Sequence, residues 1–220
     1  SNARRLTEVG FEDMLELAAH GSRVLMGRSV EFGRRFGIPL HVRSSFHDRP
    51  GTWVKETAME QAIISGVAHV KDEAQITVTG VPDRPDVAAE LVEKLADAEI
   101  NIVMIVQNVS SDGRTDISFT APEDFADLAV KAAQEAAEEL GAGDVDVDTS
   151  IAKVSLVGAG MKTEPGVAAR LFRCMADAGI NIGMISTSTI RVSVIVDEAQ
   201  VGAAVRVLAE EFDLTEEAPA

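Results

Sequence analysis

The chain is short of cysteine, of basic residues and of long apolar runs, and each shortage excludes a class of protein. Its 220 residues include one cysteine, Cys174, which excludes an internal disulfide framework and an all-cysteine metal site. No uninterrupted apolar run approaches the roughly 20 residues that a membrane span requires, and no cationic start followed by an apolar stretch suggests a secretory signal. We therefore expect a cytoplasmic protein that does not enter a membrane.

Basic residues are outnumbered, with 20 Lys and Arg against 36 Asp and Glu, which gives a formal net charge of −16. This balance argues against nucleic acid and anionic membrane as partners, because both need clustered cations. A small ligand or another protein remains. The length suffices for one or two domains with a sizeable core.

Motifs for cofactors, metals and nucleophiles are also missing. The stretch Gly158-Ala159-Gly160 lacks the third glycine of a dinucleotide fingerprint, because Thr163 stands in its place, and the chain has no Walker-type sequence. Cys174 follows Leu171 on the apolar side of an expected helix, which favours core packing over reactivity. Four histidines share no metal-ligand spacing and are expected to be structural: His20, His41, His47 and His69.

The most informative feature present is an internal repeat with a period of 80 residues. Pro85 falls on Pro165 and Leu91 on Leu171, and residues 87–89, 96–98, 100–102 and 104–105 match their counterparts without a gap. Two copies with so long a period predict a duplicated small domain rather than a solenoid.

Each copy is expected to contribute strands and helices in the order βαββαβ, with four antiparallel strands and two helices on one face. In the first copy, alternation predicts a strand that stops at Gly80, and Asp83 stands where a helix N-cap is expected, with Pro85 in the first turn. The expected elements are a strand at 75–79, a helix at 85–98, a strand at 100–109, a turn at 111–113, a strand at 115–120, a helix at 122–140 closed by Gly141, and a strand from 145.

The second copy lacks a last strand. Its expected elements are a strand at 153–157, a helix at 165–178, strands at 180–187 and 190–196, and a helix at 199–212. Because residues 216–220 have the character of a tail, we expect the apolar run 62–70, ahead of the first copy, to donate the missing strand.

Several long motifs resemble aspartate kinase. Residues 153–162, 165–167, 185–188 and 190–193 resemble the second regulatory repeat of that family, and residues 107–111 and 115–120 resemble the first. These repeats are ACT domains, ferredoxin-like modules that bind amino acids. Residues 11–16, 21–25 and 38–46 resemble the last part of the amino-acid-kinase domain.

The resemblance implies an α+β fold with two ferredoxin-like βαββαβ ACT domains in tandem, the first inserted in the second. A helix-and-strand remnant of the kinase domain precedes them. The implied boundaries are 4–58 for the remnant and linker, 74–149 for the first ACT domain, 59–73 plus 150–215 for the second, and 216–220 for a tail. The likeness is to the actinobacterial form, in which a regulatory subunit also starts internally, and Met59 falls at that start.

By the same resemblance, the chain is the regulatory part of an aspartate kinase that senses threonine, with lysine as a second effector, in feedback inhibition of aspartate phosphorylation. The catalytic residues of the family lie in the missing kinase lobe, so we expect no catalytic residues, metal or cofactor in this chain, and ATP and Mg only in the parent kinase. The expected partners are a second copy, joined through the ACT domains, or a full-length kinase chain. One alternative is an assembly subunit that has lost effector sensing. Another, an acylphosphatase-like enzyme of the same topology, lacks an anion-cradling loop with an arginine.

The chemistry of a free amino acid suggests where it binds. Its carboxylate favours backbone N–H groups at a helix N-terminus, and its ammonium favours oxygen acceptors, so the loops 81–86 and 161–166 are candidates. From the residues alone, Asp83 is either an ammonium ligand or only an N-cap, and Gln107 can bond a hydroxyl. The resemblance places a threonine site where the first repeat of one chain meets the second repeat of another: Asp83, Ala88, Gln107, Asn181 and Ile182. It places a second site, associated with the lysine response, at Met161, Gly166, Asn101, Ile102 and Ser188.

Three positions depart from the family pattern. Asp86 replaces a glycine and either faces the ligand carboxylate, which it would repel, or faces solvent at the helix N-terminus, where a negative charge is favourable. Gly183 and Thr189 stand where the family commonly carries glutamate, so two carboxylates that the ε-ammonium of lysine could use are missing. Threonine is therefore the stronger candidate effector.

Overall fold

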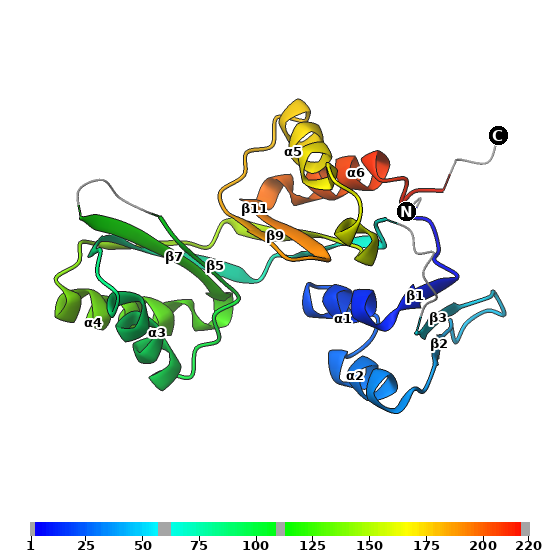
Figure 1. Cartoon of the computed structure of the whole chain (residues 1–220), viewed down its shortest axis with the longest axis horizontal. Coiled ribbons are helices and arrows are strands. Elements are labelled where there is room, and N and C mark those ends of the chain that lie inside the picture. The colour runs from blue at the N-terminus through cyan, green and yellow to red at the C-terminus, as the bar shows by residue number, and fades with distance from the viewer. Residues whose placement is uncertain (1–2, 57–62, 109–112, 217–220) are drawn as a thin grey trace. The chain divides into compact units, whose positions relative to one another are not determined.

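The computed structural model describes residues 3–56, 63–108 and 113–216. The chain divides into two compact units, one made of residues 1–70 with 153–220 and the other of residues 71–152. Figure 1 labels the helices and several strands of both units. Met59, Ala62, Val109, the predicted turn residues 111–112 and the tail from residue 217 lie outside the described residues.

The unit of residues 71–152 has the order βαββαβ. Its sheet order is β6-β7-β5-β8, and the paired strands are antiparallel. Helices α3 and α4 pack together over one face of this sheet (Figure 1). The elements are β5 (Glu73–Pro82), α3 (Val87–Asp97), β6 (Met104–Gln107), β7 (Arg114–Pro122), a 3-10 turn (Glu123–Phe125), α4 (Ala126–Leu140) and β8 (Val145–Asp148). The predicted ferredoxin-like fold is confirmed for this repeat.

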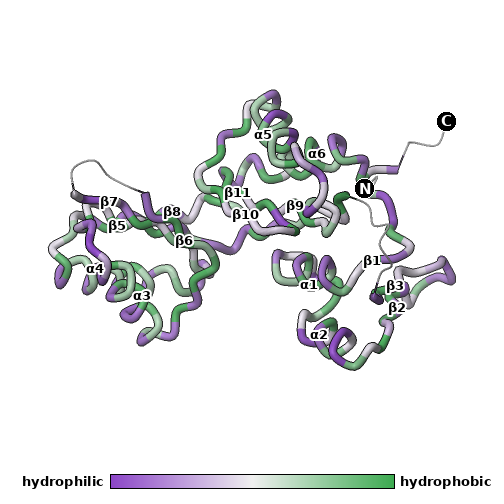
Figure 2. The backbone as a smooth tube through the Cα atoms, viewed as in Figure 1, coloured by the Kyte–Doolittle hydropathy of each residue, from purple (hydrophilic) through white to green (hydrophobic). Residues whose placement is uncertain are grey.

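The core of this unit follows the hydrophobic periods of the sequence. Along β5, Ala74, Ile76 and Val78 are fully buried while the residues between them are partly exposed, because successive side chains of a strand point to opposite faces. Leu91 and Leu95, one turn apart on α3, are also fully buried. Figure 2 shows hydrophilic and hydrophobic segments in turn along the helices, as in amphipathic helices.

The structure corrects three expectations for the first repeat. Strand β5 continues to Pro82 through a bulge between Val78 and Val81, instead of stopping at residue 79. The strand expected from residue 100 begins at Met104. The predicted N-cap role of Asp83 is wrong, because α3 begins at Val87 with Asp86 at the N-cap.

The second repeat belongs to the other unit and completes its sheet with a strand from the chain ahead of the first repeat. The sheet order is β10-β11-β9-β4. Strand β4 (Gly66–Val70) pairs antiparallel with β9, from Gly66 opposite Val157 to Val70 opposite Lys153, which confirms the predicted donated strand. The other elements are β9 (Ile151–Val157), the 3-10 turn η2 (Ala159–Lys162), α5 (Val167–Asp177), β10 (Ile185–Thr187), β11 (Arg191–Asp197), the 3-10 turn η3 (Glu198–Gln200) and α6 (Val201–Glu211). Strand β10 is shorter than the predicted 180–187.

The N-terminal segment of the same unit packs on this second repeat. Its elements are β1 (Glu8–Gly10), α1 (Phe11–Ala19), α2 (Gly27–Phe36), β2 (Leu40–Val42) and β3 (Thr52–Lys55), with a sheet order β1-β3-β2. Phe11, Met14 and Leu17 of α1 form one apolar cluster with Ala68 of β4 and Val157 of β9. Helix α1 is therefore attached directly to the sheet of the second repeat. In the described parts of the chain, no helix has the length and apolarity needed to cross a membrane.

Candidate functional site

A cavity of about 410 Å³ opens at the start of α5, between the loop that precedes this helix and the turn that joins β10 to β11. Both walls belong to the second repeat. The lining residues are Met161, Lys162, Glu164, Gly166, Val167, Ala168, Thr187, Ser188, Thr189 and Val192.

Two glycines shape the loop before α5. A Cβ on Gly158 would lie 2.2 Å from the backbone oxygen of Ile63, so only glycine permits this approach. Gly166, the N-cap of α5, has φ of 99° and ψ of −8°, a left-handed conformation that glycine adopts without strain. On the opposite wall, the backbone N–H of Ser188 donates to the oxygen of Arg191 at 2.8 Å and closes the turn.

The lining combines both charges, hydroxyl groups and apolar side chains. Lys162 supplies a cation and Glu164 an anion, and Thr187, Ser188 and Thr189 supply hydroxyls. Among the residues that the structure describes, no side chain caps the N-terminus of α5, and the first N–H groups of a helix have no partner within the helix itself. A site with these groups suits a small zwitterion whose carboxylate lies near the helix N-terminus.

Three residues of the predicted second site line this cavity together: Met161, Gly166 and Ser188. The other two, Asn101 and Ile102, belong to the unit of residues 71–152 and lie between α3 and β6. Asn181 and Ile182, predicted for the threonine site, lie in the loop between α5 and β10 and are not among the lining residues.

Of the three departures from the family pattern, Thr189 lies in the cavity lining. Gly183 lies in the loop before β10, where its N–H donates to the oxygen of Ile195 at 2.9 Å. Neither position carries a carboxylate, so Glu164 is the one acidic residue of the lining.

In the first repeat, the three predicted residues lie at one end of the sheet. Strands β5 and β6 are both antiparallel to β7, so they run in the same direction and terminate at the same end of the sheet, where α3 begins. Asp83 follows β5, Gln107 ends β6 and Ala88 lies in the first turn of α3. An 80-residue shift carries Ala88 and Gln107 onto Ala168 and Thr187, which both line the cavity of the second repeat.

Asp86 differs from its counterpart Gly166 in both charge and backbone. It has φ of −86° and a side chain that is 56% exposed, and its Oδ1 lies 3.2 Å from Nε of Arg84. Arg84 also approaches Glu90, at 3.5 Å. Within this chain, Asp86 therefore faces solvent and is paired with a cation, which is the second of the two orientations expected from the sequence.

Helix α1 makes polar contacts with the 3-10 turn η2 and with the start of β11, the segments that flank the cavity lining. Asp13, only 1% exposed, accepts a hydrogen bond from Ser65. Burial raises the pKa of Asp13, against the opposing effects of the Ser65 hydroxyl and the backbone N–H of Ala159 in η2. At the start of β11, Arg191 contacts the ring of His20 and lies 3.6 Å from a carboxylate oxygen of Glu16.

Sequence reasoning missed two charged residues of the cavity, Lys162 and Glu164. Both lie in the loop 161–166 that was singled out as a candidate, so the opposite charges of that loop were an available clue. No such clue exists for the contact of Lys162 with α1, because its Nζ lies 3.3 Å from Oε2 of Glu12, a residue 150 positions away in the sequence.

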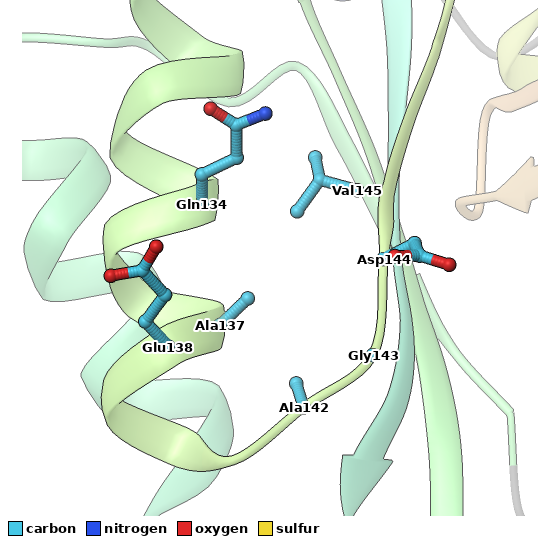
Figure 3. A pocket seen from close by; sticks show the side chains of 7 residues that line it. All are labelled: Gln134, Ala137, Glu138, Ala142, Gly143, Asp144 and Val145. Carbon is cyan, nitrogen blue, oxygen red and sulfur yellow. The ribbon is translucent and has the colours of Figure 1, made fainter.

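A second cavity, of about 400 Å³, lies in the other unit between the end of α4 and β8. In Figure 3, Gln134 and Glu138 extend from the helix and Val145 points toward it from the strand, while the carboxylate of Asp144 points away. The carbonyl end of a helix and the nearby Glu138 disfavour an anion. This cavity therefore suits an amino acid carboxylate less well than the one beside α5.

Comparisons with known proteins agree with this structure. The family described as the ACT domain matches residues 76–136 and 154–212. An aspartokinase of Mycolicibacterium smegmatis is 48% identical over 219 residues, which cover 97% of this chain and 52% of that protein. The chain spans about half the length of the curated relatives it matches.

Solved structures show the same relationship. A chain from the crystal structure of aspartokinase alpha and beta subunits is 45% identical, with a TM-score of 0.65, and the match covers 69% of this chain and 99% of that one. The ligand-free regulatory subunit of aspartate kinase from Thermus thermophilus is 39% identical, with a TM-score of 0.65 and the same two coverages. The chain therefore belongs to the aspartokinase family, of which it carries the regulatory portion built from two ACT domains.

Proposed function

We propose that this chain senses a free amino acid and that binding at the cavity beside α5 feeds back on aspartate phosphorylation by the parent kinase. The observation that carries the proposal is the lining of that cavity, in which Lys162 and Glu164 accompany the uncapped N-terminus of α5. A zwitterion has a carboxylate for Lys162 and the helix N-terminus, and an ammonium for Glu164. The acidic net charge of the chain gives a neutral ligand no general attraction, so recognition depends on these few groups.

Threonine is the first candidate effector and lysine the second. The hydroxyls of Thr187 and Ser188 supply hydrogen-bonding partners for the hydroxyl of threonine. A lysine ligand carries two ammonium groups, whereas the lining offers the single carboxylate of Glu164, since Thr189 stands where the family carries glutamate. The cavity volume falls in the range usual for small-molecule sites.

We also propose a threonine site between two chains, formed by Asp83, Ala88 and Gln107 of one chain with Asn181 and Ile182 of the other. Its support is that the first three lie at one end of the sheet of the first repeat, and that the 80-residue shift carries two of them, Ala88 and Gln107, onto cavity-lining residues of the second repeat. The partner is a second copy or the regulatory part of a full-length kinase chain, and the related structure of aspartokinase alpha and beta subunits supports such an association. For effector binding to alter kinase activity, the bound effector needs only to stabilise one arrangement of the paired chains over another by about 1–3 kcal/mol.

We infer that aspartate phosphorylation is carried out by the parent kinase, of which this chain carries the regulatory portion. ATP and Mg²⁺ then serve the parent kinase, in the cytoplasm. An assembly subunit without effector sensing is the alternative, and the observation that bears on it is Thr189, which lines the cavity where the family carries a glutamate.

Titration calorimetry of the chain with L-threonine and L-lysine tests the proposal. We expect saturable heat with L-threonine and a weaker response to L-lysine. Ser188→Ala should weaken binding, and Ser150→Ala, in the loop between β8 and β9, serves as a matched control. The absence of heat with both amino acids at millimolar concentration would leave only the assembly role.

A further inference from the structure

Lys162 belongs both to the lining of the cavity beside α5 and to an ion pair with helix α1. It lines the cavity beside α5, and its Nζ lies 3.3 Å from Oε2 of Glu12 on α1. The other oxygen of Glu12 lies 3.4 Å from Nη2 of Arg34 on α2. Glu12 therefore links the cavity wall to both helices of the N-terminal segment.

Among the residues that line the cavity, Lys162 is the only basic one. A ligand carboxylate in this cavity has the N-terminus of α5 and the ammonium of Lys162 as its favourable partners. We propose that Lys162 binds the carboxylate of the amino acid effector and that Glu12 competes for the same ammonium, so that occupancy of the cavity weakens the contact between η2 and the first turn of α1. This inference rests on the proposed function of the cavity.

The competition follows from charge. An ammonium group has three N–H donors, but two carboxylates that approach one cation repel each other, so each weakens the other's contact. The side chains of Lys162 and Glu12 are 48% and 45% exposed, and an exposed pair of this kind is weak. A ligand carboxylate can therefore displace Glu12 at little cost.

The remainder of α1 is held more firmly. Met14 and Leu17 lie in the apolar cluster with the sheet, and Asp13 is buried against Ser65. Displacement of Glu12 would consequently change the first turn of α1 and its link to Arg34 while the helix stays in place. This confines the effect of the ligand to the part of the segment that faces the cavity wall.

A double-mutant cycle on the intact chain tests the inference, with L-threonine and L-lysine as probes in calorimetry. Glu12→Gln should tighten binding by about 2- to 5-fold, because it removes a competitor worth as much as an exposed ion pair. Lys162→Met should weaken binding by about tenfold or more. In the Lys162→Met background, Glu12→Gln should have no further effect.

Matched controls come from the other unit, where Nζ of Lys94 lies 2.6 Å from Oε1 of Glu139. Lys94→Met and Glu139→Gln remove charges of the same kind and should leave affinity unchanged. L-threoninol, which lacks the carboxylate, should bind the wild type and Glu12→Gln equally.

The outcomes separate the two claims. If the wild type binds neither amino acid, the proposed function fails, and this inference fails with it. If the wild type binds but Lys162→Met binds as tightly, or if Glu12→Gln weakens binding, the inference is overturned while the proposed function stands. Because the three side chains at this contact are exposed, all variants should keep the wild-type unfolding midpoint to within a few degrees.

Discussion

Gly166 and Gly202 provide a matched pair of substitutions that tests the loop geometry of the cavity. At both glycines, no described atom beyond the local backbone lies within 4 Å of the position that a Cβ would take, so alanine meets no tertiary clash. They differ in backbone conformation, because Gly166 has φ of 99° whereas Gly202 lies in the first turn of α6 without a positive φ. Any difference between the two alanine variants therefore reports backbone strain.

The expected free-energy changes have opposite signs. Alanine at Gly166 must adopt a left-handed conformation, which costs about 1–2 kcal/mol. Alanine at Gly202 keeps its conformation and restricts the unfolded chain, which stabilises by about 0.4–1 kcal/mol. The two variants should thus differ by about 2 kcal/mol in the free energy of unfolding. Gly166→Ala should also weaken threonine binding, because the strained loop lines the cavity.

Trp53 gives an assay specific to the relevant unit. It is the single tryptophan of the chain, it lies on β3, and its ring stacks on His41 with centroids 3.9 Å apart. Urea unfolding followed by tryptophan fluorescence therefore reports on the unit that contains the second repeat. Equal stabilisation by both substitutions would refute the left-handed conformation at Gly166.

Three further predictions concern burial, unit independence and the first-repeat loop. Because burial raises the pKa of Asp13, the folded chain holds this proton more tightly than the unfolded chain does, and the free energy of unfolding should fall as pH rises above the usual carboxyl pKa. Asp13→Asn should remove this fall, and identical urea–pH profiles of the wild type and the variant would contradict the prediction. Leu171→Ala should lower the free energy of unfolding that Trp53 fluorescence reports by about 2–5 kcal/mol. Leu91→Ala, its counterpart in the other unit, should chiefly shift the unfolding transition followed by circular dichroism. An equal shift of the Trp53 transition by both variants would argue against two separate units. Asp86→Gly should change threonine affinity by less than about twofold, since one exposed ion pair is weak, and a large gain would favour the assembly role.

Much of the fold could be predicted because the two copies of the repeat support the same assignment of strands and helices. The 80-residue shift and the period-2 and helical patterns identified the elements of both copies, and the missing strand of the second copy pointed to the run that forms β4. The strand bulge after Val78 and the start of α3 at Val87 were not predictable in this way, because register and helix ends depend on pairing with β7 and on loop geometry.

The candidate site was predictable only in part. Met161, Gly166 and Ser188 could be placed from the repeat and the family resemblance, and they do lie in one cavity. The ion pair of Lys162 with Glu12 joins residues 150 positions apart, and no local pattern indicates such a contact. Tertiary packing of α1 against the second repeat creates it.

The most direct test of the account is a calorimetric titration of the wild-type chain and Lys162→Met with L-threonine under identical conditions. The account predicts saturable binding to the wild type and affinity about tenfold or more weaker for the variant. Binding that is absent from the wild type at millimolar L-threonine, or equally tight in both proteins, would contradict it.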